Sequence, residues 1–212
     1  MKKVMFLAIL AGLLSVLAGC QSDQEQATEI HTKVEESASL EDKFTANQKD
    51  LASSRKKVNE SYQKVLSLEN NDAETIKQTL NDLEISTESK KLDEARENFQ
   101  NAYATLMSID ENIKLIKDKD EKKTATKIMT LMKDRKKLMD SYFELYQKQL
   151  DSQSKLFENL EQGNFELAAL EEQVKTINDE SQKMVDVVEH VNQVTEEYNE
   201  VKSEYFDMAG LS

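Results

Sequence analysis

The sequence predicts an all-α fold, namely an elongated antiparallel up-down bundle of long helices that pack in the manner of a coiled coil. Three observations lead to this fold class. The chain of 212 residues contains no proline and only 4 glycines, the two residue types that most disfavour a helix. Apolar side chains recur every seven residues in several long segments, which is the period of a coiled-coil seam. These segments have similar lengths and are joined by short polar turns, so successive helices are expected to be antiparallel neighbours.

The first segment, residues 1–19, has the composition of a secretory signal. It opens with Met1-Lys2-Lys3, continues as an apolar run from Val4 to Leu17 and closes with Leu17-Ala18-Gly19-Cys20. A basic start, a short apolar stretch and small residues before a cleavage point are typical of a signal that is removed. The last four residues resemble a bacterial lipobox, which implies that the Cys20 thiol receives a diacylglyceryl group and becomes the mature N-terminus. An uncleaved membrane anchor is the alternative, but a spanning helix needs about 20 apolar residues and this run is shorter.

Residues 20–29 are expected to form a polar, acidic tether after the acylated cysteine, and residues 30–209 to form the helical bundle domain. The first long helix is predicted from Ile30 to Val65, because its apolar residues follow a helical period. They are Ile30, Val34, Phe44, Leu51, Val58, Tyr62 and Val65. The polar residues that interrupt this stripe are Ser37, Gln48 and Arg55.

The second helical segment follows the stop signal Asn70-Asn71-Asp72 and is predicted to reach Ile116. Its apolar rows change phase on the way, so we expect a kink or short break at Ser86–Ser89, where hydroxyl side chains compete for backbone hydrogen bonds. A turn is expected in the charged stretch Lys117–Lys123.

The third helix begins after that turn and is predicted to end at Gly163, since glycine commonly follows the last turn of a helix. The fourth helix carries apolar residues at helical spacing from Leu170 to Met208.

A second apolar row lies beside the first on the third helix. Its members are Met139, Phe143, Tyr146, Leu150, Phe157 and Leu160. One interpretation is an exposed surface that binds a partner helix or a ligand. The alternative, which we favour, is a helix packed against two neighbours, because a bundle requires such double-sided helices.

The turn before the third helix carries lysines. They are Lys117, Lys119, Lys122 and Lys123. In an up-down bundle this turn returns to the anchored end, so it is a candidate for contact with anionic lipid headgroups. Acidic residues are close in the sequence, and internal pairing of these charges is the more common outcome.

Charge and residue content exclude several kinds of chemistry. The formal net charge of −13 disfavours nucleic acid and other anionic polymers as direct ligands. The single cysteine, once acylated, leaves no thiol for a disulfide, for catalysis or for a metal. His190 lies near Asp186 and Glu189, but the paired Glu-x-x-His motifs of di-iron bundles do not occur. We therefore expect no metal, no cofactor and no enzymatic activity.

The basic start, the Leu17-Ala18-Gly19-Cys20 motif and the proline-free helical body from about Glu29 to Met208 together resemble the YkyA-type cell-wall-binding lipoproteins of Gram-positive bacteria. The resemblance covers nearly the whole chain, although only the lipobox is a sharp motif. It implies membrane anchoring at the wall interface and association with the wall. It supplies no catalytic residues.

Two functional hypotheses follow. The first is a lipoprotein anchored to the extracytoplasmic face of the cell membrane that acts without catalysis as a helical spacer, a scaffold or a cell-wall-associated binding protein. Its partners would be the membrane, a cell-wall component or an envelope protein, and self-association is left open by the coiled-coil stripes. The alternative is a surface lipoprotein that binds a small ligand or a metal in a pocket between helices.

Overall fold

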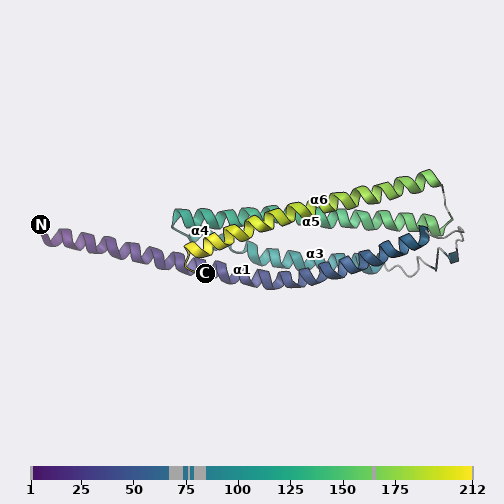
Figure 1. The fold of residues 1–212 in the computed structure, drawn as a ribbon. Helices are drawn as coiled ribbons and strands as arrows, with labels where there is room; N and C mark the ends of the chain where they lie inside the picture. The colour runs from purple at the N-terminus through teal and green to yellow at the C-terminus, as the bar shows by residue number, and fades with distance from the viewer. Residues whose placement is uncertain (1, 67–73, 76, 79–84, 164–165, 212) are drawn as a thin grey trace. The chain divides into compact units, whose positions relative to one another are not determined.

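The computed structural model describes residues 2–66, 74–75, 77–78, 85–163 and 166–211; the side chains of residues 2–21 and of a few positions beside the gaps are not part of that description. The elements are α1 (Lys2–Leu66), α3 (Ile85–Met107), α4 (Asp110–Leu115), α5 (Lys119–Glu161) and α6 (Leu167–Met208), as Figure 1 shows. The described residues contain no strand. The prediction of an all-α helical bundle is confirmed.

The chain divides into two compact units. Unit 1 comprises Met1–Ser39, Asn101–Arg135 and Gln193–Ser212, and unit 2 comprises Leu40–Gln100 and Lys136–Asn192. Because these ranges cut through long helices, α1, α3, α5 and α6 each contribute residues to both units.

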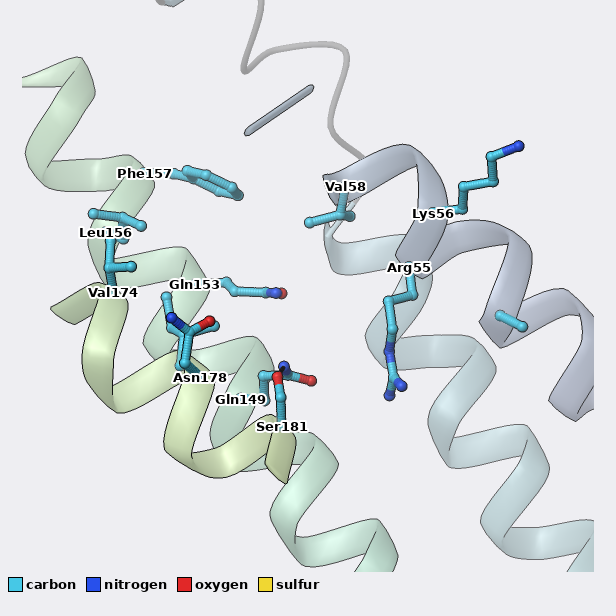
Figure 2. A pocket seen from close by; sticks show the side chains of 12 residues that line it. Arg55, Lys56, Val58, Gln149, Gln153, Leu156, Phe157, Val174, Asn178 and Ser181 are labelled. Carbon is cyan, nitrogen blue, oxygen red and sulfur yellow. Dashed lines mark hydrogen bonds between the residues drawn. The ribbon is translucent and has the colours of Figure 1, made fainter. Parts of the chain in front are cut away.

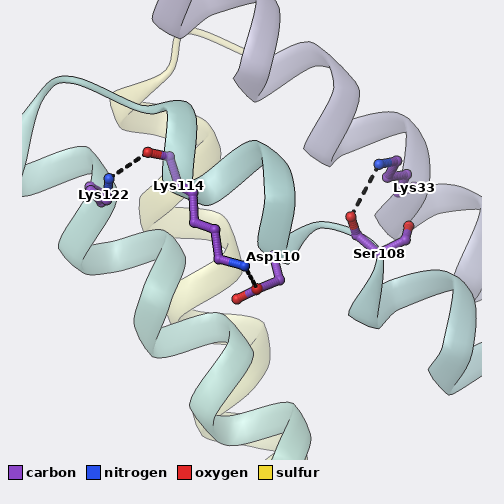
Figure 3. Close-up of polar contacts among 5 residues, drawn as sticks. All are labelled: Lys33, Ser108, Asp110, Lys114 and Lys122. Carbon is purple, nitrogen blue, oxygen red and sulfur yellow. Dashed lines mark hydrogen bonds and ion pairs between the residues drawn. The ribbon is translucent and has the colours of Figure 1, made fainter.

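Unit 1 consists of antiparallel helix pairs, as its hydrogen bonds and ion pairs show. Residues that ascend along α1 meet residues that descend along the α3–α4 region: Gln26 with Asn112, Lys33 with Ser108, and Ser37 with Ala102. Lys33 and Ser108 appear in Figure 3. The same relation holds for α5 and α6, where Glu121 meets Tyr205 and Lys127 meets Glu197. The prediction of antiparallel neighbours is confirmed within this unit.

The core of unit 1 is formed by aliphatic residues of α1, α3, α4 and α5, with rings supplied by α6. The fully buried members include Ala27, Ile30, Ile109, Ala125, Ile128 and Tyr205. Burial of apolar area at about 25 cal/mol per Å² is the main force that holds such helices together.

Unit 2 has the same antiparallel arrangement around a different interior. Asn47 of α1 bonds Asn98 of α3, and further along α1 Ser54 meets Lys91. Its core contains Phe44, Leu51, Leu92, Phe99, Met139, Tyr142, Phe143, Tyr146, Leu150 and Met184. The aromatic rings of Phe44, Phe99 and Phe143 contact one another, with centroid distances of 5.4, 6.0 and 6.2 Å.

Ser86–Ser89, near which a break was expected, lie inside α3 in its first turns, and residues 79–84, just before this helix, lie outside the described residues. An interruption occurs at Ser108 and Ile109, between α3 and α4. There the Ser108 hydroxyl donates a hydrogen bond of 2.6 Å to the Thr105 carbonyl oxygen. This is the competition between a hydroxyl and the helical ladder that was expected earlier in the chain. The predicted stop at Asn70-Asn71-Asp72 lies outside the described residues.

The other two predicted helix ends agree with the structure. The chain leaves the helix at Ile116–Asp118, and Asp118 caps α5 because its Oδ1 accepts the backbone N–H groups of Asp120 and Glu121 at 2.9 Å each. Helix α5 ends just before Gly163, which has a φ of 75°, a left-handed conformation that glycine adopts without strain.

The segment expected to be a free tether, residues 20–29, differs from that expectation. It is helical, and Asp23 and Ala27 are buried, with exposed fractions of 7% and 0%. Asp23, Ala27, Ile30 and Val34 are spaced three or four residues apart, so they share one face of α1. The apolar pattern of the sequence did not reveal this face, because Asp23, at its start, is a carboxylate rather than an apolar side chain.

Among the described residues, no helix is both long enough and apolar enough to cross a membrane.

Candidate functional site

The end of unit 1 that lies nearest to Cys20 in the sequence is fixed by Asp23. The two carboxylate oxygens of Asp23 accept the backbone N–H groups of Lys117 and Asp118, each at 2.9 Å. These N–H groups belong to the turn between α4 and α5, and a turn outside a helix provides no helical carbonyl oxygen to accept their hydrogen bonds. The basic turn is therefore bound to α1 three residues after Cys20.

The four lysines of the basic turn differ in their surroundings. Lys117, Lys119 and Lys123 are exposed, whereas Lys122 is half-buried. The ammonium group of Lys122 donates to the carbonyl oxygens of Lys114 and Ile116, at 2.7 and 3.3 Å. Figure 3 shows the bond from Lys122 to Lys114 at the end of α4, where the last carbonyl groups of a helix lack donors from within the helix. Three of the four predicted residues thus present their charge to solvent.

Two further features shape this end of unit 1. Leu115, at the end of α4, is a large apolar side chain with 60% of its surface exposed. The pKa of Glu121 is raised, first because the carboxyl group is partly buried and then because the negative charges of Asp23 and Asp118 are close. The basic turn therefore combines exposed cations with one exposed apolar side chain, and the acidic groups Asp23, Asp118 and Glu121 lie close to one another at the same end of unit 1.

The predicted partner surface on the third helix is buried. Met139, Phe143, Tyr146, Leu150, Phe157 and Leu160 have exposed fractions between 0% and 7%. These residues lie on the core side of α5, so an exposed partner groove at this row is contradicted by the structure. The physical reason is that α5 packs on more than one neighbour and needs two adjacent apolar rows to do so.

Beside this row, unit 2 contains buried polar side chains that the sequence pattern did not reveal. Glu88, only 2% exposed, accepts a hydrogen bond of 2.6 Å from the Tyr146 hydroxyl, while its other carboxylate oxygen has no partner among the described residues. Burial raises the pKa of Glu88, although the Tyr146 bond and the charge of Arg55 oppose the rise. Burial likewise raises the pKa of the Tyr146 hydroxyl.

A cavity of about 520 Å³ lies among α1, α5 and α6 in unit 2, and we call it the unit 2 cavity. Its lining residues are Ala52, Arg55, Lys56, Val58, Gln149, Gln153, Leu156, Phe157, Val174, Ile177, Asn178 and Ser181. Figure 2 shows Phe157 and Gln153 extending from α5 toward α1, where Val58 faces them and the Arg55 side chain extends downward in this view. Apolar walls with a few convergent polar groups are typical of small-molecule sites of this size.

The described residues contain no group of three or more His, Cys, Asp or Glu side chains that could hold a metal ion. His190 and Asp186, the pair considered from the sequence, are both exposed, and Asp186 accepts a hydrogen bond from the Gln182 amide at 2.9 Å.

The fold and the lipobox together define a helical lipoprotein, and comparisons with known proteins identify its family. Residues 25–208 match the family described as "Putative cell-wall binding lipoprotein", YkyA, and the chain belongs to it. A relative from Bacillus subtilis (strain 168), named "Uncharacterized lipoprotein YkyA", is 24% identical over 206 residues, which cover 92% of this chain and 88% of the relative. The resemblance inferred from the sequence is thereby confirmed.

A solved structure has the same fold. It is a crystal structure of a conserved protein of unknown function from Staphylococcus aureus, which matches with a TM-score of 0.64 at 17% identity. The match covers 86% of this chain and 93% of that one. At this level of identity it supports the helical fold alone.

Sequence reasoning missed Asp23, Glu88 and the role of Arg55. Asp23 sits four residues before Ala27 on the face that continues to Ile30, which is a signal that a helical wheel drawn from Cys20 onward would contain. Arg55 interrupts an apolar stripe at a core position, so a buried polar partner could have been expected there. Glu88 carries no such signal, because carboxylates are abundant along the whole chain.

Proposed function

We propose that the protein is a non-enzymatic helical spacer or scaffold of the cell envelope, held on the extracytoplasmic face of the cell membrane by a lipid on Cys20. Membership of the lipoprotein family and the lipobox support the anchor. The observation that carries the proposal is the bond between Asp23 and the α4–α5 turn. Three residues of helix span about 4.5 Å, so a lipid on Cys20 would hold this turn close to the headgroups.

The lipid anchor is tested by Cys20→Ala. This substitution removes the only thiol, so the variant should accumulate as an unprocessed precursor that incorporates no radiolabelled palmitate. Ser22→Ala, two residues downstream, is the matched control and should be processed normally. A Cys20→Ala protein that is processed and retained in the membrane like the native one would contradict the anchor.

The basic turn is proposed to contact anionic headgroups through Lys117, Lys119 and Lys123, with Leu115 reaching the interfacial region. A spin label at Lys119→Cys, in the mature lipoprotein reconstituted in nanodiscs, reports this contact. We expect the label to be shielded from an aqueous relaxant when the lipid is anionic, and less shielded in zwitterionic lipid. Equal accessibility in the two lipids would contradict a charge-dependent contact.

The scaffold role is tested by photo-crosslinking in living cells. Val188 on α6 is 40% exposed, so a photoreactive residue at this position faces solvent, whereas one at Met184, which is 2% exposed, faces the core. A dominant adduct with one envelope protein or with wall material from Val188, and none from Met184, is expected of a scaffold. Internal adducts alone from both positions would contradict docking at this face of α6.

The second candidate function is the binding of a small ligand in the unit 2 cavity. It is favoured by one observation, namely a concave site with apolar walls and several polar groups. The family name concerns the cell wall, and a wall fragment bound in a cavity would be compatible with it.

A further inference from the structure

The unit 2 cavity has an unusual charge for this protein. The chain has 41 acidic residues against 28 basic ones, yet among the described residues that line the cavity none is acidic and two, Arg55 and Lys56, are basic. The lining therefore differs in charge from the chain as a whole, and it offers a basic side chain to a ligand that carries a negative group.

Arg55 is the cation that is positioned to bind such a group. Its guanidinium carbon lies 4.4 Å from the centre of the Tyr146 ring, a stacking contact that fixes the orientation of the planar group. Its Nε–H is buried without a hydrogen-bond partner among the described residues, one terminal nitrogen contacts the weak acceptor Met184 Sδ at 3.8 Å, and the guanidinium group also interacts with the Tyr142 hydroxyl. The planar fork of donors thus retains bonding capacity, which a carboxylate can fill with two parallel hydrogen bonds.

Lys56 provides a comparison within the same turn of α1. Its side chain points away from the cavity in Figure 2, and its ammonium group pairs with Glu60 at 3.7 Å while 79% of the side chain is exposed. A surface pair of this kind contributes little. The two adjacent cations therefore have different roles, and Lys56 serves as a control for Arg55.

Glu88 does not line the cavity, but its charge interacts with that of Arg55. Its interaction with Arg55 lowers the pKa of Glu88 less than burial raises it. One of its oxygens is already bound by Tyr146. Arg55 therefore interacts with the charge of a buried carboxylate that has one oxygen without a hydrogen-bond partner among the described residues, and a ligand carboxylate in the cavity would supply the hydrogen bonds that Glu88 does not.

The remaining polar groups of the cavity match the amides of a peptide. Gln153 and Asn178 each carry a side-chain amide that can both donate and accept, as a peptide group does, whereas the buried Gln149 amide already donates to the Ser181 hydroxyl. Leu156, Phe157, Val174 and Ile177 form an apolar wall that fits small aliphatic side chains. The volume of about 520 Å³ lies within the range that holds a compact ligand.

We propose that the unit 2 cavity binds a short peptide that ends in a free α-carboxylate and carries small aliphatic side chains. Arg55 binds the carboxylate, the amides of α5 and α6 pair with the peptide backbone, and the apolar wall packs on the side chains. This inference rests on the second candidate function, ligand binding in the cavity, and it names the class of ligand.

The test uses the mature lipoprotein in nanodiscs of zwitterionic lipid and two probes, acetyl-trialanine and its C-terminal amide. Titration calorimetry is expected to show saturable binding of the acid, with the amide weaker by about tenfold because it lacks the charge that pairs with Arg55. Acetate at the same concentration should not displace the peptide. Equal affinity for acid and amide, or displacement by acetate alone, would overturn the proposal.

Three variants separate the contributions. Arg55→Gln should weaken binding of the acid by about tenfold and leave the amide unchanged, whereas Lys56→Gln should change neither by more than a small factor. Ile177→Trp should fill the cavity and abolish binding of both probes. Circular dichroism melting of each variant verifies that it is folded, and the acid–amide comparison on the native protein does not depend on any variant.

The outcomes distinguish this inference from the function on which it rests. Binding of both probes with equal affinity, abolished by Ile177→Trp, would mean that the cavity binds ligands but does not recognise a carboxylate. Binding of neither probe would overturn the peptide inference, and a cavity that also excluded apolar dyes in the native protein would overturn ligand binding altogether.

Discussion

The interior of unit 1 is mainly aliphatic, whereas the interior of unit 2 is built around aromatic rings. Among the described residues of unit 1, the buried rings of the core come from α6, as Tyr198, Tyr205 and Phe206. In unit 2 they come from three helices, with Phe44 on α1, Phe99 on α3 and Phe143 among those on α5. The cavity of about 520 Å³ is also located in unit 2.

The two units also differ in how the buried carboxylates Asp23 and Glu88 are hydrogen-bonded. In unit 1, Asp23 has both oxygens bound by backbone N–H groups, and its burial fixes a turn. In unit 2, Glu88 has one oxygen bound by Tyr146 and the other without a partner among the described residues. A buried and incompletely paired charge lowers stability, so a role in binding is one reason for a protein to keep it. Unit 2 is therefore the part of the molecule in which we expect a binding site.

The largest effect is expected from Phe143→Ala in unit 2. Phe143 is 0% exposed and contacts the rings of Phe44, Phe99 and Tyr142, so the substitution leaves a cavity at the centre of the aromatic cluster. The free energy of unfolding should fall by about 3–5 kcal/mol. Urea unfolding followed by circular dichroism measures this change.

Glu144→Ala is the matched control, because Glu144 is the exposed neighbour on the same helix. Its effect should stay within about 0.5 kcal/mol. If the two variants lost similar stability, the aromatic cluster would not be the centre of unit 2 and the comparison of the two cores would fail.

A smaller and local effect is expected from Asp23→Ala in unit 1. The substitution leaves the N–H groups of Lys117 and Asp118 without their acceptor, at a cost of about 2 kcal/mol. Hydrogen exchange should accelerate at these two amides, while the amides of the aromatic cluster in unit 2 keep their protection. Glu25→Ala, at an exposed position on the same helix, should leave exchange at the turn unchanged. Unaltered exchange in Asp23→Ala would show that the turn is held by other contacts.

Ser37→Ala in unit 1 should have a still smaller effect. The Ser37 hydroxyl is buried, at 3% exposure, and donates a hydrogen bond of 2.8 Å to the Ala102 carbonyl oxygen of α3. Alanine keeps the packing and removes this bond, so the loss should be about 1 kcal/mol. Ser39→Ala, exposed on the same helix, is the control for helix propensity. A loss in Ser37→Ala no larger than that of the control would mean that the buried bond adds nothing.

Ser37 also shows why the fold was more predictable than the sites. Apolar residues at a spacing of seven fix which face of a helix is buried, and with similar segment lengths and short turns they predicted a bundle of antiparallel neighbours. The glycine at 163 predicted the end of α5. The polar residues Ser37, Gln48 and Arg55 interrupt this apolar spacing in the sequence. In the structure each of them contacts a neighbouring helix, through Ala102, Tyr142 and Tyr146 respectively.

Such contacts depend on which residues of different helices meet, and a spacing rule for one helix carries no information about this. The position of the α3–α4 break was missed for the same reason. Serine and threonine are present both at Ser86–Ser89 and around Ser108, and at the second site Lys33 of another helix donates to the Ser108 carbonyl oxygen at 3.2 Å. The interaction between helices selected one of two locally similar sequences.

The smallest change is expected from Glu88→Gln, and its sign is opposite to that of the others. Glutamine keeps the volume and an oxygen for the Tyr146 hydroxyl, but it removes the charge whose burial raises the pKa of Glu88 above 4.5. With a raised pKa the folded state binds the proton more tightly than the unfolded chain, so the native protein loses stability as pH rises from about 4.5 through the folded pKa. The variant should therefore be the more stable protein at pH 7, with a difference that disappears below the ordinary glutamate range, as thermal melts at a series of pH values would show.

Glu97→Gln, on the exposed side of the same helix, should show no such trend. If Glu88→Gln were instead less stable than the native protein at neutral pH, the attraction between Glu88 and Arg55 would outweigh desolvation. Arg55 would then already have its partner in unit 2, and the cavity would have no unpaired guanidinium to offer a ligand carboxylate.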